Sequence, residues 1–131
     1  MKKLAIALIV TVLFSSFAGT KPLTGTWEFK GGIYNGKKEG ATVGYVLQKK
    51  YTAGAFECFM VEKGSKPQKY QAGIYKIDDK IYTETETFSS QESQVTGKPI
   101  KYQYTISHDT LTIRGTLPTG MKVEEYWKKV K

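Results

Sequence analysis

Apolar and polar residues alternate along most of the chain after residue 20. In the first such segment, residues 23–33, one face would carry Leu23, Gly25, Trp27, Phe29, Gly31 and Ile33. Successive side chains of a strand point to opposite faces, so this pattern is typical of a strand with one buried face. The adjacent Gly31 and Gly32 fall inside this strand and predict a bend or bulge there.

Seven further segments show the same period of two, and none after residue 20 has the 3.6-residue period of an amphipathic helix. They span residues 41–49, 53–62, 69–77, 80–88, 99–107, 110–116 and 121–130. The side chains expected to face inward are Val43, Tyr45 and Leu47; Phe56, Cys58 and Met60; Gly73, Tyr75 and Ile77; Tyr102, Tyr104 and Ile106; Leu111 and Ile113; and Met121, Val123, Glu125 and Trp127. Segment 80–88 has two candidate inner faces, which are Tyr82, Glu84, Glu86 and Phe88 or Ile81, Thr83, Thr85 and Thr87.

The connections between these segments alternate in length. Those after the first, third, fifth and seventh segments are long or loose, at residues 35–40, 63–68, 89–98 and 117–120, whereas those at 50–52, 78–79 and 108–109 are tight. In an up-and-down arrangement this places all long loops at one end and all tight turns, with both termini, at the other. Trp27 and Trp127 lie near the two ends of the chain, which predicts that the first and last strands meet. The sequence therefore predicts an all-β, eight-stranded antiparallel up-and-down barrel, wide enough to be filled by side chains or to hold one small ligand.

The first 18 residues differ from the rest of the chain. Lys2 and Lys3 precede an apolar run from residue 4 to residue 14, and the small-x-small stretch Ser16-Phe17-Ala18 follows it. This is the pattern of a secretory signal peptide, and the apolar run is shorter than the ~20 residues that a membrane-spanning helix needs. No cysteine near the cleavage site could accept a lipid. We therefore expect a secreted or periplasmic protein without a stable membrane anchor, with residues 19–131 forming one domain.

Charge and cysteine content narrow the possible functions. The net charge is +8, but Arg114 is the only arginine and the lysines are scattered, so we expect no nucleic-acid partner. The single Cys58 excludes an internal disulfide. One cysteine and one histidine, His108, cannot build a dedicated transition-metal site, and no pattern for a cofactor is present.

Catalytic constellations are also nearly absent. His108 lies beside Asp109 in a predicted turn, and Cys58 lies in the middle of a strand, where it is expected to be an inert core thiol. Glu84 and Glu86 share one strand face, so a hydrolase with a carboxylate pair is conceivable, but glutamates in a threonine-rich strand are usually solvated. We therefore expect no catalytic residues and a protein that is not an enzyme.

Several short motifs resemble those of the lipocalins. The Gly25-x-Trp27 pair is similar to the lipocalin G-x-W signature, and the wider pattern, over residues 22–131, resembles small secreted bacterial lipocalin-like (calycin-type) domains of unassigned function. The further motifs are Leu23-x-Gly25, Gly73-x-Tyr75, Tyr82-Thr83-Glu84, Asp109-Thr110-Leu111-Thr112-Ile113-x-Gly115 and Glu125-x-Trp127-Lys128-Lys129. The resemblance implies that Trp27 plugs the base of the barrel, with Lys128 or Lys129 where classical lipocalins stack an arginine over this tryptophan. It also implies binding of small, mostly apolar molecules.

The candidate site consists of polar and aromatic residues on the expected inner faces. We expect the ligand to contact Phe56, Met60, Tyr75, Tyr82, Glu84, Tyr102, Tyr104 and Glu125. A carboxylate inside a barrel is costly unless it is paired, so Glu84 and Glu125 either anchor a ligand or bond to tyrosine or lysine and fix the packing. The sequence favours a binding protein for a small apolar or amphipathic molecule. The alternative is a protein- or glycan-interaction module whose barrel is filled by side chains, and an open cavity of several hundred cubic ångströms would distinguish the two.

Overall fold

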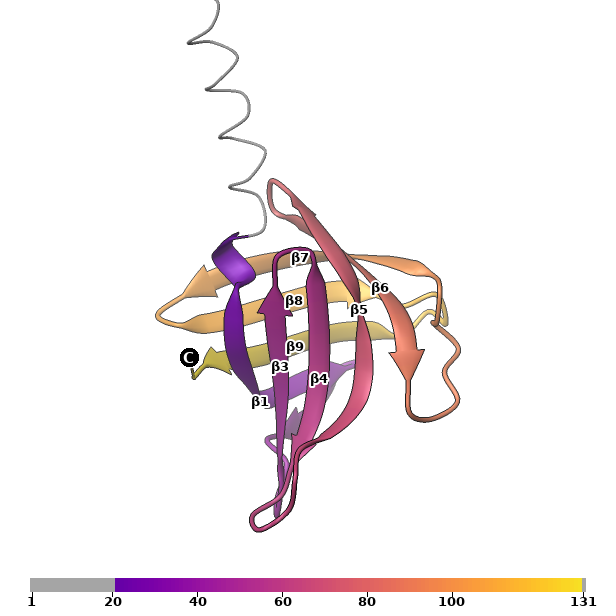
Figure 1. Ribbon diagram of the computed structural model, residues 1–131. Coiled ribbons are helices and arrows are strands. Elements are labelled where there is room, and N and C mark those ends of the chain that lie inside the picture. Colours follow the sequence, from indigo (N-terminus) through magenta and orange to yellow (C-terminus); the bar gives the residue numbers. More distant parts are fainter. Residues whose placement is uncertain (1–20, 131) are drawn as a thin grey trace, which may run out of the picture.

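The computed structural model describes residues 21–130 (Figure 1). A short 3-10 helix, η1 (Lys21–Leu23), precedes nine strands: β1 (Gly25–Tyr34), β2 (Lys37–Gly40), β3 (Val46–Thr52), β4 (Ala55–Val61), β5 (Gln68–Asp78), β6 (Ile81–Ser89), β7 (Pro99–Ser107), β8 (Thr110–Thr116) and β9 (Lys122–Lys129). The predicted signal peptide, residues 1–18, lies outside the described residues. Within residues 21–130 no helix is long and apolar enough to cross a membrane.

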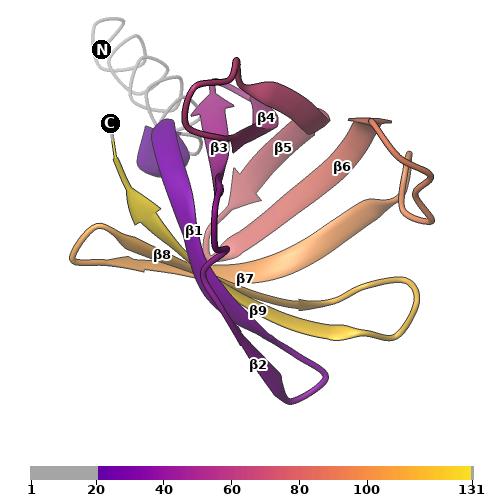
Figure 2. The same cartoon turned by 90° about the horizontal axis from the view of Figure 1, so that it is seen from below.

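Eight of the strands form a closed antiparallel barrel. Strand β1 pairs with β3 on one side and with β9 on the other, and the strands from β3 to β9 follow one another in chain order. The predicted closure of the first strand on the last is therefore confirmed. Strand β2 is an addition that pairs only with the outer part of β1, and Figure 2 shows this hairpin projecting from the barrel.

The two ends of the barrel differ in their connections. The base end carries η1 and the tight turns β3–β4, β5–β6 and β7–β8, and the opposite end, the mouth, carries the longer loops (Figure 1). His108 and Asp109 have positive φ angles of 52° and 60°, as a two-residue type I′ turn requires. The predicted segregation of loops and turns is confirmed, with one exception in the first connection.

The first connection is a hairpin, and the prediction of a loose loop at 35–40 was wrong. Asn35 and Gly36 have φ angles of 50° and 83°, so they form a tight turn from which β2 returns along β1. The next strand begins only at residue 46, and Val43, expected to face inward, is 91% exposed. That strand continues to residue 52, so Tyr51, expected in a turn, lies within β3 and is 1% exposed.

Strand β1 bends at its glycine pair, as predicted. It pairs with β3 as far as Glu28 and with β2 from Gly31 onward, and its register against β9 shifts between Phe29 and Gly31. A side chain at Gly31 (φ 134°) would approach the Glu39 carbonyl oxygen to 2.7 Å. The bulge reverses the facing of the next residues, so Tyr34 lies inside the barrel and Ile33, expected inside, does not.

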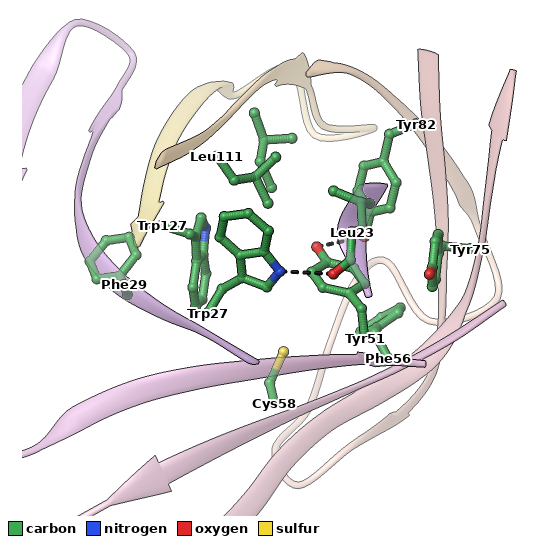
Figure 3. Close-up of a cluster of buried hydrophobic side chains, with 11 residues drawn as sticks. Leu23, Trp27, Phe29, Tyr51, Phe56, Cys58, Tyr75, Tyr82, Leu111 and Trp127 are labelled. Carbon is green, nitrogen blue, oxygen red and sulfur yellow. Dashed lines mark hydrogen bonds between the residues drawn. The ribbon is translucent and has the colours of Figure 1, made fainter. Parts of the chain in front are cut away.

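The core occupies the base half of the barrel (Figure 3). Its largest fully buried side chains are Trp27, Tyr51, Tyr82, Phe56, Leu23, Leu111 and Cys58. The indole N–H of Trp27 donates to the Leu23 carbonyl oxygen at 2.8 Å, so η1 and Trp27 together close the base. Trp127 packs edge-on against Phe29, with ring centroids 5.3 Å apart, whereas Lys129 lies opposite Trp27 with its Nζ 5.6 Å from the ring centroid. The two tryptophans thus share one cluster, and Lys129 takes the position over Trp27 that the lipocalin resemblance implied.

Candidate functional site

The mouth half of the barrel is hollow. A cavity of about 490 Å³ opens there, bounded toward the base by the buried cluster. Its aromatic wall residues are Phe29, Tyr34, Tyr45, Tyr70, Tyr102 and Trp127. Its charged wall residues are Glu39, Lys49, Glu84, Glu86 and Glu125. A second depression, of about 510 Å³, continues along β4 and β5 and shares Tyr45, Leu47 and Tyr70 with this cavity.

An ion pair crosses the barrel at the floor of the cavity. Lys49 on β3 donates to the Glu84 carboxylate on β6, and these two strands are separated in the sheet by β4 and β5. Both side chains are less than a tenth exposed. The Tyr82 hydroxyl donates to the same carboxylate and accepts from Tyr51 at 3.2 Å. The pair therefore ties opposite walls together and separates the aromatic core from the hollow half.

The Lys49 ammonium rests on aromatic rings as well as on a carboxylate. Its Nζ lies 4.4 Å from the ring centroid of Phe56 and 5.3 Å from that of Tyr51, within the range of cation–π attraction. Burial works to lower the pKa of Lys49, but the charge and hydrogen bond of Glu84, together with the nearby Tyr51 and Cys58, outweigh it and hold the pKa well above its ordinary value. The lysine is therefore charged.

Glu86 ties the β6–β7 loop to the cavity wall. Its carboxylate accepts from the Gln71 side-chain amide and from the Thr96 hydroxyl, both at 2.6 Å. Burial works to raise the pKa of Glu86, but the hydrogen bonds from Ser93, Thr96 and Gln71 outweigh it and lower the pKa below its ordinary value of 4.5. The ionised form is thus the one that holds the loop against the cavity wall.

Glu125 is the carboxylate on the opposite wall. It accepts from the Tyr34 hydroxyl at 2.7 Å and from the Trp127 indole N–H at 3.4 Å. Burial, together with the adjacent Glu125 charge, raises the pKa of Tyr34 well above its ordinary value, so this phenol keeps its proton and remains a donor. The bulge in β1 creates this contact, because without it Tyr34 would face outward.

Cys58 is part of the cavity wall, and its thiol is not activated as a nucleophile. Its thiol is 1% exposed and lies 3.4 Å from the Gln71 side-chain oxygen, to which it donates. Burial raises the pKa of the Cys58 thiol to about 12, and the thiolate needed for nucleophilic chemistry is therefore scarce at neutral pH. Among residues 21–130 no group of three or more histidine, cysteine or acidic side chains is placed to hold a metal ion.

The structure distributes the eight sequence-predicted site residues over four regions. Glu84, Tyr102 and Glu125 line the cavity. Phe56, Tyr75 and Tyr82 lie in the packed core beneath it, Met60 lines the neighbouring depression, and Tyr104 lies toward the base, where its hydroxyl donates to the Asp79 carbonyl oxygen. The inner face of β6 is that of Tyr82, Glu84 and Glu86, since Ile81 is 36% exposed; Phe88, expected on the same face, is 42% exposed.

Sequence reasoning missed the residues that complete the cavity. Lys49 is one of the scattered lysines and was not among the predicted site residues, although it lies two positions after Leu47 and so shares its face. That spacing is a signal that could have found it. Tyr34 carried no such signal, because the bulge that turns it inward changes the phase of the strand.

The fold and the site together define a closed antiparallel barrel with an open, charged cavity at one end. A comparison with protein families matches residues 22–131 to the family described as Domain of unknown function (DUF4488). This match spans most of the chain, and the chain belongs to that family. The closed barrel is consistent with the lipocalin-like fold that the sequence motifs implied. A comparison with curated proteins found no match.

Proposed function

We propose that this protein is a non-catalytic binding protein that holds one small amphipathic molecule in the mouth half of the barrel. The observation that carries the proposal is the cavity of about 490 Å³ above a complete core. That volume lies in the range of small-molecule sites, which are concave, largely pre-formed and lined by apolar walls with a few polar groups. A barrel fold is compatible with this role.

The distribution of side chains supports an amphipathic ligand. Phe29, Leu47, Ile100 and Trp127 give the cavity apolar surface, and Gln71 and Glu125 give it fixed polar groups. A protein- or glycan-interaction module would need no such space, because its barrel would be packed to the mouth. The open volume therefore favours the binding protein over the module.

The proposal includes export from the cytoplasm. Its support is the basic, apolar and small-x-small pattern of residues 1–18, and it implies a ligand met in the periplasm or outside the cell. Cleavage after residue 18 would be visible as the mass of the mature protein isolated from its host.

A neutral fluorescent probe tests the cavity. N-phenyl-1-naphthylamine should bind the wild-type protein with increased emission, and Leu47→Arg should abolish that binding by placing a long charged side chain in the cavity. The matched control is Gln48→Arg, the same change at the next residue, which lies outside the cavity. Urea unfolding of each variant checks that it folds, and Tyr45→Arg at the rim is a second way to block the site. A wild type that binds the probe no better than Leu47→Arg and Tyr45→Arg would overturn the proposal.

A further inference from the structure

We infer that the ligand of this cavity is a cation, namely a molecule with a protonated amine or a quaternary ammonium group attached to an apolar body. The inference rests on the proposed function and specifies the chemical class of the ligand. It follows from the imbalance of charge inside the barrel, the kind of donors that satisfy the wall carboxylates, and the aromatic surface around them.

The cavity walls have the opposite charge to the chain as a whole. The chain carries a net charge of +8, yet among residues 21–130 four carboxylates and a single lysine line the cavity. That lysine, Lys49, is already committed to Glu84. The remaining acidic residues of the wall are Glu39 at the exposed rim and Glu86 and Glu125 inside.

Neutral groups alone satisfy the two inner carboxylates. Tyr34 and Trp127 donate to Glu125, while Gln71 and Thr96 donate to Glu86. Across residues 21–130 no lysine, arginine or histidine lies within ion-pair distance of either one. The donors hold the carboxylates in place without neutralising them, so the empty volume has a negative potential that an anionic ligand would have to overcome.

The aromatic wall is suited to the same charge. Tyr34, Tyr70, Tyr102 and Trp127 line the same cavity as Glu125, and aromatic faces attract cations. The protein already holds one cation in this way, since the Lys49 ammonium bonds to the Glu84 carboxylate and lies 4.4 Å from the centroid of the Phe56 ring. A ligand ammonium at Glu125 would have the same kind of surroundings one level nearer the mouth.

Three naphthalene derivatives of nearly equal size test the charge preference. They are 1-naphthylmethylamine (cationic), 1-naphthalenemethanol (neutral) and 1-naphthaleneacetate (anionic). Each is titrated calorimetrically into the mature protein at pH 7. The amine should bind about tenfold more tightly than the alcohol, because a hydrogen bond between charged groups is stronger than a neutral one, and the acetate should bind most weakly.

Variants at two neighbouring glutamates locate the effect. Glu125→Gln should weaken binding of the amine about tenfold and leave the alcohol within about twofold of wild type. Glu124→Gln is the matched control, because Glu124 bonds to Arg114 and Tyr126 and does not line the cavity; it should change neither ligand. If Glu125→Gln does not fold, Glu86→Gln replaces it with the same expectation.

The outcomes separate this inference from the proposed function. Equal binding of the amine and the alcohol would overturn the inference and leave the binding cavity intact, as would tighter binding of the acetate. Loss of amine affinity in Glu124→Gln as well would show that surface charge, not the cavity, attracts the cation. If none of the three ligands nor the neutral probe binds, the proposed function and the inference fail together.

Discussion

The base and mouth halves of the barrel are built from the same eight strands, yet their interiors have opposite character. On β6 the inner face passes from Tyr82 to Glu84, and on β9 it passes from Trp127 to Glu125, in a single step of two residues toward the mouth. The base is aromatic, packed and closed by η1, whereas the mouth is hollow and charged. The packed core and the charged cavity are therefore encoded on the same strands, one inward position apart.

The two halves should differ most in the stability that is lost when a large inward side chain is truncated to alanine. Trp27→Ala should reduce the free energy of unfolding by about 4 kcal/mol, because it empties the fully buried base. Leu47→Ala, beside a space that is already open, should cost less than about 2 kcal/mol. Urea unfolding measures both. Equal losses would mean that the mouth half is packed in solution.

Substitution of the ion pair at the boundary between the two halves should reduce the stability nearly as much. Lys49→Met should cost about 3 kcal/mol, because it leaves the Glu84 carboxylate buried without its cation. Adding Glu84→Gln should recover part of that loss. The control is Lys69→Met, which breaks an ion pair that is more than two-fifths exposed on each side and should cost less than about 0.5 kcal/mol. A loss in Lys49→Met as small as that in Lys69→Met would show that Glu84 is hydrated.

The base half should tolerate no added volume at its tightest point. A side chain at Gly73 would collide with the Thr85 carbonyl oxygen and approach the Phe56 ring to 2.7 Å. Gly73→Ala should therefore cost about 2 kcal/mol. Gly40→Ala is the control near the mouth, where nothing lies within 4 Å, and it should leave the urea midpoint almost unchanged. A neutral Gly73→Ala would mean that β5 and β6 can separate without loss.

The smallest expected effect depends on pH. The pKa of Glu86 is lowered in the folded state, so its stabilising contribution is present above the ordinary carboxyl value of 4.5 and is lost as pH falls through the lower folded value. Thr96→Val should cost about 1 kcal/mol at pH 7, because the Glu86 carboxylate loses a donor. The cost should shrink in urea unfolding as the pH falls below the ordinary carboxyl value of 4.5 and Glu86 becomes protonated. A pH-independent cost would assign the effect to packing of the loop.

Much of the fold could be predicted, because alternation and turn residues are local signals. Trp27 and Trp127 indicated the closure, and the position of Glu125 two residues before Trp127 placed its carboxylate inside. The bend at Gly31 was also foreseeable, since glycine inside a strand tends to mark a bulge. The effect of this bulge on the following residues was not foreseeable. A bulge shifts the alternation of inward and outward side chains by one residue, so Tyr34 and Ile33 lie on the faces opposite to those expected.

The candidate site was less predictable, because it depends on contacts between strands that are not neighbours. The spacing from Leu47 could have placed Lys49 inside, but no local pattern pairs it with Glu84, which is 35 residues away. How far the packed core extends toward the mouth depends on the combined volume of the inward side chains of all the strands. For that reason Phe56 and Tyr75, correctly placed on inner faces, lie beneath the cavity and not around it.

The pairing of β1 with β9 also determines when the barrel can form. The residues of this pair are separated by about 90 to 100 positions in the chain, so the contact with the highest loop-closure entropy is also the one that completes the sheet. Until β9 is available, β1 and β8 both present unpaired edges, and Trp27 lacks the strand that carries Trp127 and Lys129. A growing chain can therefore assemble the hairpins from β3 to β8 early, but it acquires its base, and with it the cavity, only once its last strand has been made.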